Sequence, residues 1–103
     1  MNGYVHTVYG LTKHFPREEL YGCTSQLRRS TLSVILNYIE GYARKRNAVL
    51  KNFLEISFGS LQESKYLLEF AKDEKYIKEE DFENLIVSAD RIGAMLWGIL
   101  EKM

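Results

Sequence analysis

Cysteine, proline and histidine are scarce in this chain of 103 residues, which holds one Cys, one Pro and two His. The single cysteine, Cys23, cannot form a disulfide within the chain, so a reducing compartment is expected. With only Pro16 and no Gly-, Ser- or Pro-rich tract, the chain has few breaks, which favours long helices. His6 and His14 are not part of any Cys-x-x-Cys, His-x-x-x-His or Glu-x-x-His spacing, so no metal site is predicted.

Long uncharged runs and targeting signals are also missing. No window of about 18 residues is free of charge, and no opening stretch has a basic segment followed by an apolar run and a small-residue cleavage site. A soluble, cytoplasmic protein is therefore expected. Hydrophobic residues make up 46% and charged residues 27%, a globular composition, and the length suits one domain over residues 1–103.

The net charge is zero, but the two halves of the chain are oppositely charged. Residues 1–52 hold eight Lys or Arg against three Glu, a net charge of +5, and residues 53–103 hold six Lys or Arg against eleven Asp or Glu, a net charge of −5. This asymmetry indicates either a basic surface for a polyanion or contacts between opposite halves of two copies.

The spacing of apolar residues predicts four helices, at residues 2–14, 24–45, 47–73 and 79–102. Pro16 and Gly22 lie in the connection between the first two helices, and Thr24 or Ser25 is a suitable N-cap for the second. Four amphipathic helices with short connections predict an all-α fold, an antiparallel up-down four-helix bundle.

The second helix has an unusually wide apolar surface. At 100° per residue, the apolar arc covers about 200° of its circumference, and a polar stripe covers about 80°. One neighbouring helix cannot cover such an arc, so we expect a homo-oligomer, with a ring-like arrangement, in which a second copy covers the outer side. The interface residues predicted on that side are Leu32, Leu36 and Ile39.

Two groups of polar residues are candidate functional residues. Ser33, Asn37 and Glu40 in the polar stripe are expected to form a hydrogen-bond network that sets the register of neighbouring helices. The basic residues could instead follow the phosphate backbone of RNA or DNA, or simply be solvated at the end of a helix. These basic residues are Arg28, Arg29, Arg44, Lys45, Arg46 and Lys51.

Motifs for catalysis are missing. The chain has no Gly-rich phosphate loop, and Ser57, Ser60 and Ser64 have no histidine at a suggestive spacing. The carboxylates of the Glu79–Asp81 run are better explained as helix-end charge than as a general acid and base. We therefore expect no enzyme, no catalytic residue and no cofactor.

The run from Phe15 to Arg46, followed by Phe53 to Ala71, resembles a known family. It is similar to the small four-helix-bundle proteins encoded within intervening sequences of bacterial 23S ribosomal RNA genes, which are related to the accessory protein of diversity-generating retroelements. The matching residues are Phe15-Pro16, Glu19, Tyr21-Gly22, Thr24-Ser25-Gln26-Leu27-Arg28-Arg29, Ser33, Asn37, Glu40-Gly41, Arg44, Phe53-Leu54 and Gly59-Ser60-Leu61.

The resemblance implies a four-helix up-down bundle that assembles into a homopentameric ring, with no established enzymatic activity. For the retroelement relatives it implies that a basic surface binds nucleic acid and a reverse transcriptase. By position, Arg28, Arg29 and Arg44 would be candidates for nucleic-acid contact. Two functional hypotheses follow: an oligomeric scaffold that binds RNA or DNA, and a protein-protein adaptor that binds an acidic partner and no nucleic acid.

Overall fold

The structure, a computed structural model, describes all 103 residues. It contains four α-helices and one 3-10 turn, and no strand. The helices are α1 (Asn2–Thr12), α2 (Cys23–Ala43), α3 (Asn47–Asp73) and α4 (Glu79–Glu101). The 3-10 turn η1 (Arg17–Glu19) lies between α1 and α2. The all-α fold with four helices is the one that the apolar spacing predicted.

Two helices end two residues before the limits indicated by the sequence pattern, 14 and 45. α1 ends at Thr12 because the amides of His14 and Phe15 bond to carbonyls three residues back, at 3.1 Å, which tightens the last turn. α2 ends at Ala43 because Arg44 has an extended backbone, with φ −87° and ψ 145°. The spacing of apolar residues does not predict such local changes of backbone conformation.

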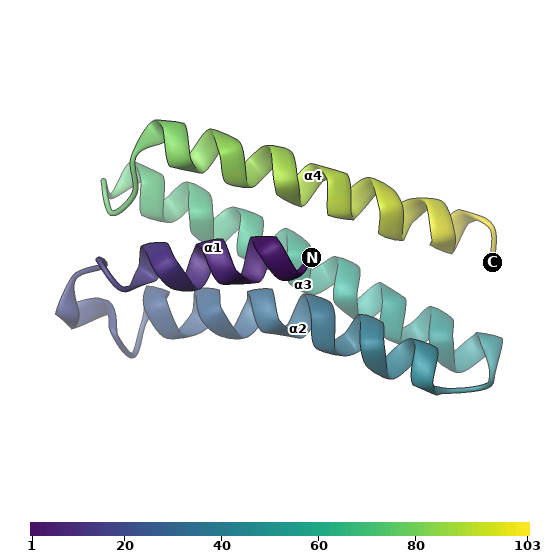
Figure 1. Cartoon of the computed structure of the whole chain (residues 1–103). Coiled ribbons are helices and arrows are strands. Elements are labelled where there is room, and N and C mark those ends of the chain that lie inside the picture. The colour runs from purple at the N-terminus through teal and green to yellow at the C-terminus, as the bar shows by residue number, and fades with distance from the viewer.

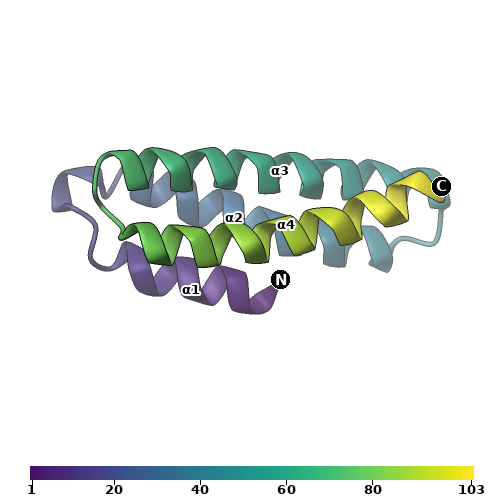
Figure 2. The ribbon, with the colours of Figure 1, turned by 90° about the horizontal axis from the view of Figure 1, so that it is seen from above.

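α2 and α3 form the most extensive contact of the fold and lie side by side along their length (Figure 1). α4 packs against α3, and α1 lies along the first part of α2 and also contacts α4 (Figures 1 and 2). The molecule is elongated, with extents of 43 × 24 × 18 Å. Because α1 has 11 residues and α2 has 21, α1 accompanies only about half of α2.

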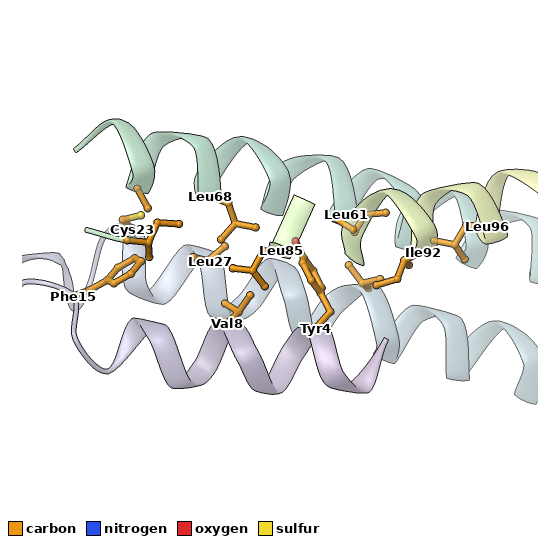
Figure 3. Close-up of a cluster of buried hydrophobic side chains, with 14 of the residues drawn as sticks. Tyr4, Val8, Phe15, Cys23, Leu27, Leu61, Leu68, Leu85, Ile92 and Leu96 are labelled. Atoms are coloured by element: carbon orange, nitrogen blue, oxygen red, sulfur yellow. The ribbon is translucent and has the colours of Figure 1, made fainter. Parts of the chain in front are cut away.

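The core is a row of leucines contributed mainly by α2, α3 and α4 (Figure 3). Leu54, Leu61 and Leu68 of α3 are spaced by seven residues, so they lie on one face, and all three are fully buried. Leu27 of α2 and Leu96 of α4 are equally buried. Val8 and Tyr4 extend the core to α1 (Figure 3).

Small residues allow α2 and α3 to approach closely. A Cβ atom added at Gly41 of α2 would lie 3.0 Å from the Cβ atom of Phe53 and 3.0 Å from Cδ1 of Leu50. Ser57 of α3 is fully buried and its hydroxyl donates to the carbonyl oxygen of Val34 at 2.6 Å. At these two points the helices are so close that a larger side chain in place of Gly41 or Ser57 would have to displace its neighbours.

The N-terminus of α2 is capped from η1 and not by the expected Thr24 or Ser25. The N-cap position is Gly22, which offers no side chain. Glu19 substitutes for it: Oε1 accepts the backbone N–H of Cys23 at 3.3 Å, and Oε2 accepts the hydroxyl of Tyr76 at 2.9 Å. The N-cap prediction was wrong because η1 brings a carboxylate to the positive end of the helix from outside it.

Tyr4 of α1 connects the short helix to the core through a buried hydrogen bond. Its hydroxyl lies 2.8 Å from Oγ of Ser64, which itself donates to the carbonyl oxygen of Leu61 at 2.8 Å. Since the one hydroxyl proton of Ser64 is used by Leu61, Tyr4 is the donor. Burial raises the pKa of Tyr4 to about 12.

We expect Tyr4→Phe to lower the free energy of unfolding at neutral pH by about 1 kcal/mol, because Ser64 loses its donor. A folded-state pKa raised from 10 to about 12 contributes stability below pH 10 that is lost as the pH rises through 12. Between those pH values, wild type should lose about 3 kcal/mol more than Tyr4→Phe. Urea unfolding at several pH values measures this difference, and equal losses in both proteins would refute it.

Candidate functional site

The outer side of α2 carries an apolar stripe that no other part of the chain covers. We call Leu32, Leu36, Ile39 and Ala43 the outer stripe; they recur at spacings of four, three and four residues and so share one side of the helix. Leu36 is 58% exposed and Ile39 is 56% exposed, and Leu32 is half-buried. Leu27 and Val34, on the opposite side, are buried in the core. α2 is therefore apolar on two opposite sides.

The polar residues beside the outer stripe form a network with α3. The hydroxyls of Ser33 and Ser60 lie 2.8 Å apart. Asn37 Nδ2 donates at 2.8 Å both to the hydroxyl and to the carbonyl oxygen of Ser33. Glu40 does not join this network, because it forms an exposed ion pair with Arg44 one turn later. Two of the three predicted network residues are thus brought together.

Ser60 is the network partner that the sequence analysis did not identify. The available signal was the row of small residues Ser57, Ser60 and Ser64 on α3. Ser57 and Ser60 bond to α2, and Ser64 bonds to Tyr4 of α1. Next to this network is an open cavity of about 460 Å³ without an apolar residue in its lining. Arg29 and Glu63 bring one charge each to it. The outer groove between α2 and α3 is consequently hydrophilic.

The six predicted basic residues do not form one surface. Fifteen residues at 1.5 Å per residue place Arg29 and Arg44 about 22 Å apart along α2. Arg28 is bound to α1: Nε donates to Oγ1 of Thr12 at 2.8 Å, and the guanidinium lies 4.9 Å from the ring centroid of Tyr9. Arg28 therefore holds α1 and α2 together, and Arg29 lies in the hydrophilic groove.

The other four basic residues gather at the opposite end of the molecule, around the turn between α2 and α3. Lys45, Arg46 and Lys51 are exposed and form no ion pair within the chain. Lys102 joins them, since the C-terminus of α4 lies at the same end of the molecule (Figure 1). Lys102 and Lys51 both line an open cavity of about 460 Å³. We call this set the basic end; it consists of Arg44, Lys45, Arg46, Lys51 and Lys102.

Tyr42 brings an aromatic side chain toward the basic end. It is 49% exposed, and its ring lies 4.8 Å from that of Tyr38 at an angle of 52°. Arg44 reaches over the ring of Phe53, with its guanidinium carbon 5.7 Å from the centroid. Cationic and aromatic side chains in such proximity are able to contact phosphates and to stack on bases.

A second exposed aromatic group lies on α3 and α4. Trp97 is 54% exposed, and its ring centroid lies 5.7 Å from that of Phe58. The indole nitrogen of Trp97 donates to Glu101 at 2.6 Å. Spacing alone does not indicate a function for this pair, because it cannot distinguish a tryptophan near an inward helix face from a core residue.

Cys23, the single cysteine, is buried. Burial and then the charge of Glu19 raise the pKa of Cys23 to about 11, so its thiol stays protonated and unreactive near neutral pH. No group of three or more His, Cys, Asp or Glu residues could hold a metal ion. None of the four helices has both the length and the apolar character that crossing a membrane requires.

A solved structure similar to this chain is that of a protein with unknown function from the S23 ribosomal protein family of Bacteroides thetaiotaomicron VPI-5482. The two are 24% identical with a TM-score of 0.87, and the match covers 95% of this chain and 92% of that chain. At this identity the similarity shows the fold alone. No curated protein matches the chain.

The sequence profile described as 23S rRNA-intervening sequence protein matches residues 2–98. This match confirms the resemblance to the intervening-sequence proteins, whereas the relation to the retroelement accessory protein stays a prediction. Since the profile covers nearly the whole chain, the protein belongs to the 23S rRNA-intervening sequence protein family.

Proposed function

We propose that the protein is a non-enzymatic scaffold, an antiparallel up-down helical bundle whose copies assemble into a ring-like homo-oligomer through the outer stripe. The observation that carries this proposal is the exposure of Leu36 and Ile39, each more than half exposed on a helix whose other side is already buried in the core. An apolar row of this kind along a helix is typical of a protein-protein interface.

Charge supports a second copy of the same chain as the partner. The outer stripe and the turn that follows it belong to residues 1–52, which carry a net charge of +5, whereas residues 53–103 carry −5. Two different surfaces of opposite charge favour a head-to-tail contact, and head-to-tail contacts close into rings when the rotation allows it. The homopentamer that the family resemblance implies is a ring of this type.

RNA or DNA binding at the basic end is the activity we propose for the scaffold. Lys45, Arg46 and Lys51 are exposed cations without an acidic partner, and Tyr42 lies on the preceding turn of α2. Each copy in a ring would present one basic end, so several weak phosphate contacts would act together. This avidity would compensate for the net charge of zero.

A protein-protein adaptor is the second candidate. The same exposed cations suit an acidic protein partner, such as a reverse transcriptase. The exposed Trp97 beside Phe58 is the kind of aromatic anchor that protein interfaces use. Under this proposal, purified complexes contain no nuclease-sensitive material.

Leu36→Glu should dissociate the oligomer while leaving helical monomers, because a carboxylate in the middle of the outer stripe cannot be desolvated between two apolar surfaces. We expect association to weaken by at least about thirtyfold. Light scattering gives the mass and circular dichroism the helix content. Val87→Glu on α4 is the matched control, since Val87 is 52% exposed and lies outside the stripe. A wild-type protein that is monomeric in solution would refute the proposed assembly.

Lys45→Glu combined with Arg46→Glu should abolish binding of a short RNA or DNA in a gel shift at low salt. For wild type, the logarithm of the affinity should fall linearly with the logarithm of the salt concentration, and each lost phosphate contact should reduce that slope by about 1. The matched control is Lys75→Glu combined with Arg91→Glu, which makes the same charge change away from the basic end. If wild type shifts no nucleic acid at low salt, the adaptor hypothesis is favoured.

A further inference from the structure

An open cavity of about 380 Å³ lies where α1, the connection containing η1 and the first turns of α2 meet. Three cationic side chains, Lys13, Arg17 and Arg28, contribute to its lining, together with the hydroxyl-bearing side chains of Thr12 and Thr24. The remaining lining residues are apolar or proline, and none is acidic. The volume is within the range of small-molecule sites in proteins, about 300 to 1,000 Å³.

The cations that line this cavity have no ion-pair partner within the chain. Lys13, Arg17 and Arg28 take part in none of the ion pairs. Glu19 follows in the same connection, but its two carboxylate oxygens are directed to the backbone of α2 and to Tyr76. The lining itself therefore carries positive charge only, although Glu18 and Glu19 are nearby in η1, and a bound anion would balance that charge.

Thr24 provides an independent indication of a missing partner. It is 4% exposed, and its Oγ1 is the one buried side-chain polar atom of the chain without a hydrogen-bond partner. A buried hydroxyl without a partner is unfavourable, and proteins rarely leave one. Thr24 lines the cavity, and its buried Oγ1 would reach the cavity by a change to the second χ1 rotamer that threonine adopts in helices.

Arg28 is held in a defined position at this cavity. Its Nε–H is used by Thr12, and its guanidinium lies against the ring of Tyr9. The two terminal nitrogens form no hydrogen bond within the chain, so their N–H groups are free to donate to a ligand. A guanidinium fixed in this way matches the planar, two-pronged recognition of phosphate oxygens.

We propose that this cavity binds an oxyanion, a phosphate group, through Arg17, Arg28 and the hydroxyl of Thr24. The cavity is larger than a phosphate group requires, which leaves room for the molecule that bears it. The site is at the opposite end of α2 from the basic end, so the inference does not rest on the proposed nucleic-acid binding. The phosphate could belong to a small phosphorylated compound or to a nucleic-acid backbone, and the two sources share the same recognition chemistry.

Thermal unfolding and calorimetric titration of the full chain with inorganic phosphate test the site, with chloride at equal ionic strength as the reference. Wild type should be stabilised by phosphate, and Arg17→Gln should weaken binding by about tenfold, the effect of losing one hydrogen bond to a charged group. Arg17 is suited to this test because it is exposed and makes no side-chain contact that the fold needs. Arg91→Gln, an exposed arginine of α4, is the matched control and should bind phosphate as wild type does.

Thr24→Val separates a ligand-binding hydroxyl from a structural one. The variant keeps the shape of the side chain and removes the buried polar atom that has no partner, so the unliganded protein should be as stable as wild type or more stable. If the hydroxyl contacts the anion, phosphate affinity falls in this variant. Unchanged affinity would show that Thr24 does not belong to the site.

The source of the phosphate is identified by a second probe, a short single-stranded RNA. If a small compound supplies the group, inorganic phosphate binds and RNA binding is insensitive to Arg17→Gln. If the nucleic-acid backbone supplies it, Arg17→Gln weakens RNA binding, and inorganic phosphate alone binds poorly. The proposal is overturned if neither probe binds in a manner that depends on Arg17.

Discussion

The close packing of α2 on α3 is the constraint on which the other features of this protein depend. Gly41 leaves no space for a Cβ atom against Phe53, and the buried hydroxyl of Ser57 bonds directly to the α2 backbone. At these points only small groups of α2 and α3 fit, and the large apolar side chains of α2 form two sets elsewhere along the helix. One set, with Leu27 and Val34, enters the core, and the other set is the outer stripe.

The cations at the two ends of α2 have different surroundings. At its N-terminus, η1 supplies the capping carboxylate of Glu19, and Arg28 ties α2 to α1, so the cations there belong to an ordered framework with a cavity in it. At its C-terminus the cations are in an exposed turn, where only Arg44 has an acidic partner. An ordered guanidinium suits one bound anion, whereas flexible exposed cations suit an extended polyanion.

The residues that the sequence could assign are those determined by periodicity within one helix. The seven-residue spacing of Leu54, Leu61 and Leu68 defines an inner face whatever lies opposite, and the wide apolar arc of α2 similarly implied an outer stripe. Periodicity does not reveal which helix lies opposite a given face. For this reason Ser60 was not recognised as the partner of Ser33.

Long charged side chains were the least predictable part of the site. Arg28 and Arg29 are adjacent in sequence and were grouped together, but a rotation of 100° per residue directs them to different neighbours, α1 for Arg28 and the outer α2–α3 groove for Arg29. Glu40 likewise pairs along its own helix rather than across to α3. These choices depend on which acceptors the tertiary fold brings within reach, and that information is spread over the whole chain.

The free energy gained by burying the outer stripe limits how copies of the chain could associate. Full burial of a leucine or isoleucine contributes about 1.5 to 3 kcal/mol, and Leu36 and Ile39 are already nearly half covered, so burying the rest of both contributes about 2 to 3 kcal/mol. Association costs at least about 4 kcal/mol in lost translational and rotational freedom. Leu36 and Ile39 alone therefore cannot hold two copies together. A stable assembly has to add neighbouring apolar surface such as Tyr42, the attraction between oppositely charged halves, and closure of a ring, in which every copy makes two contacts instead of one.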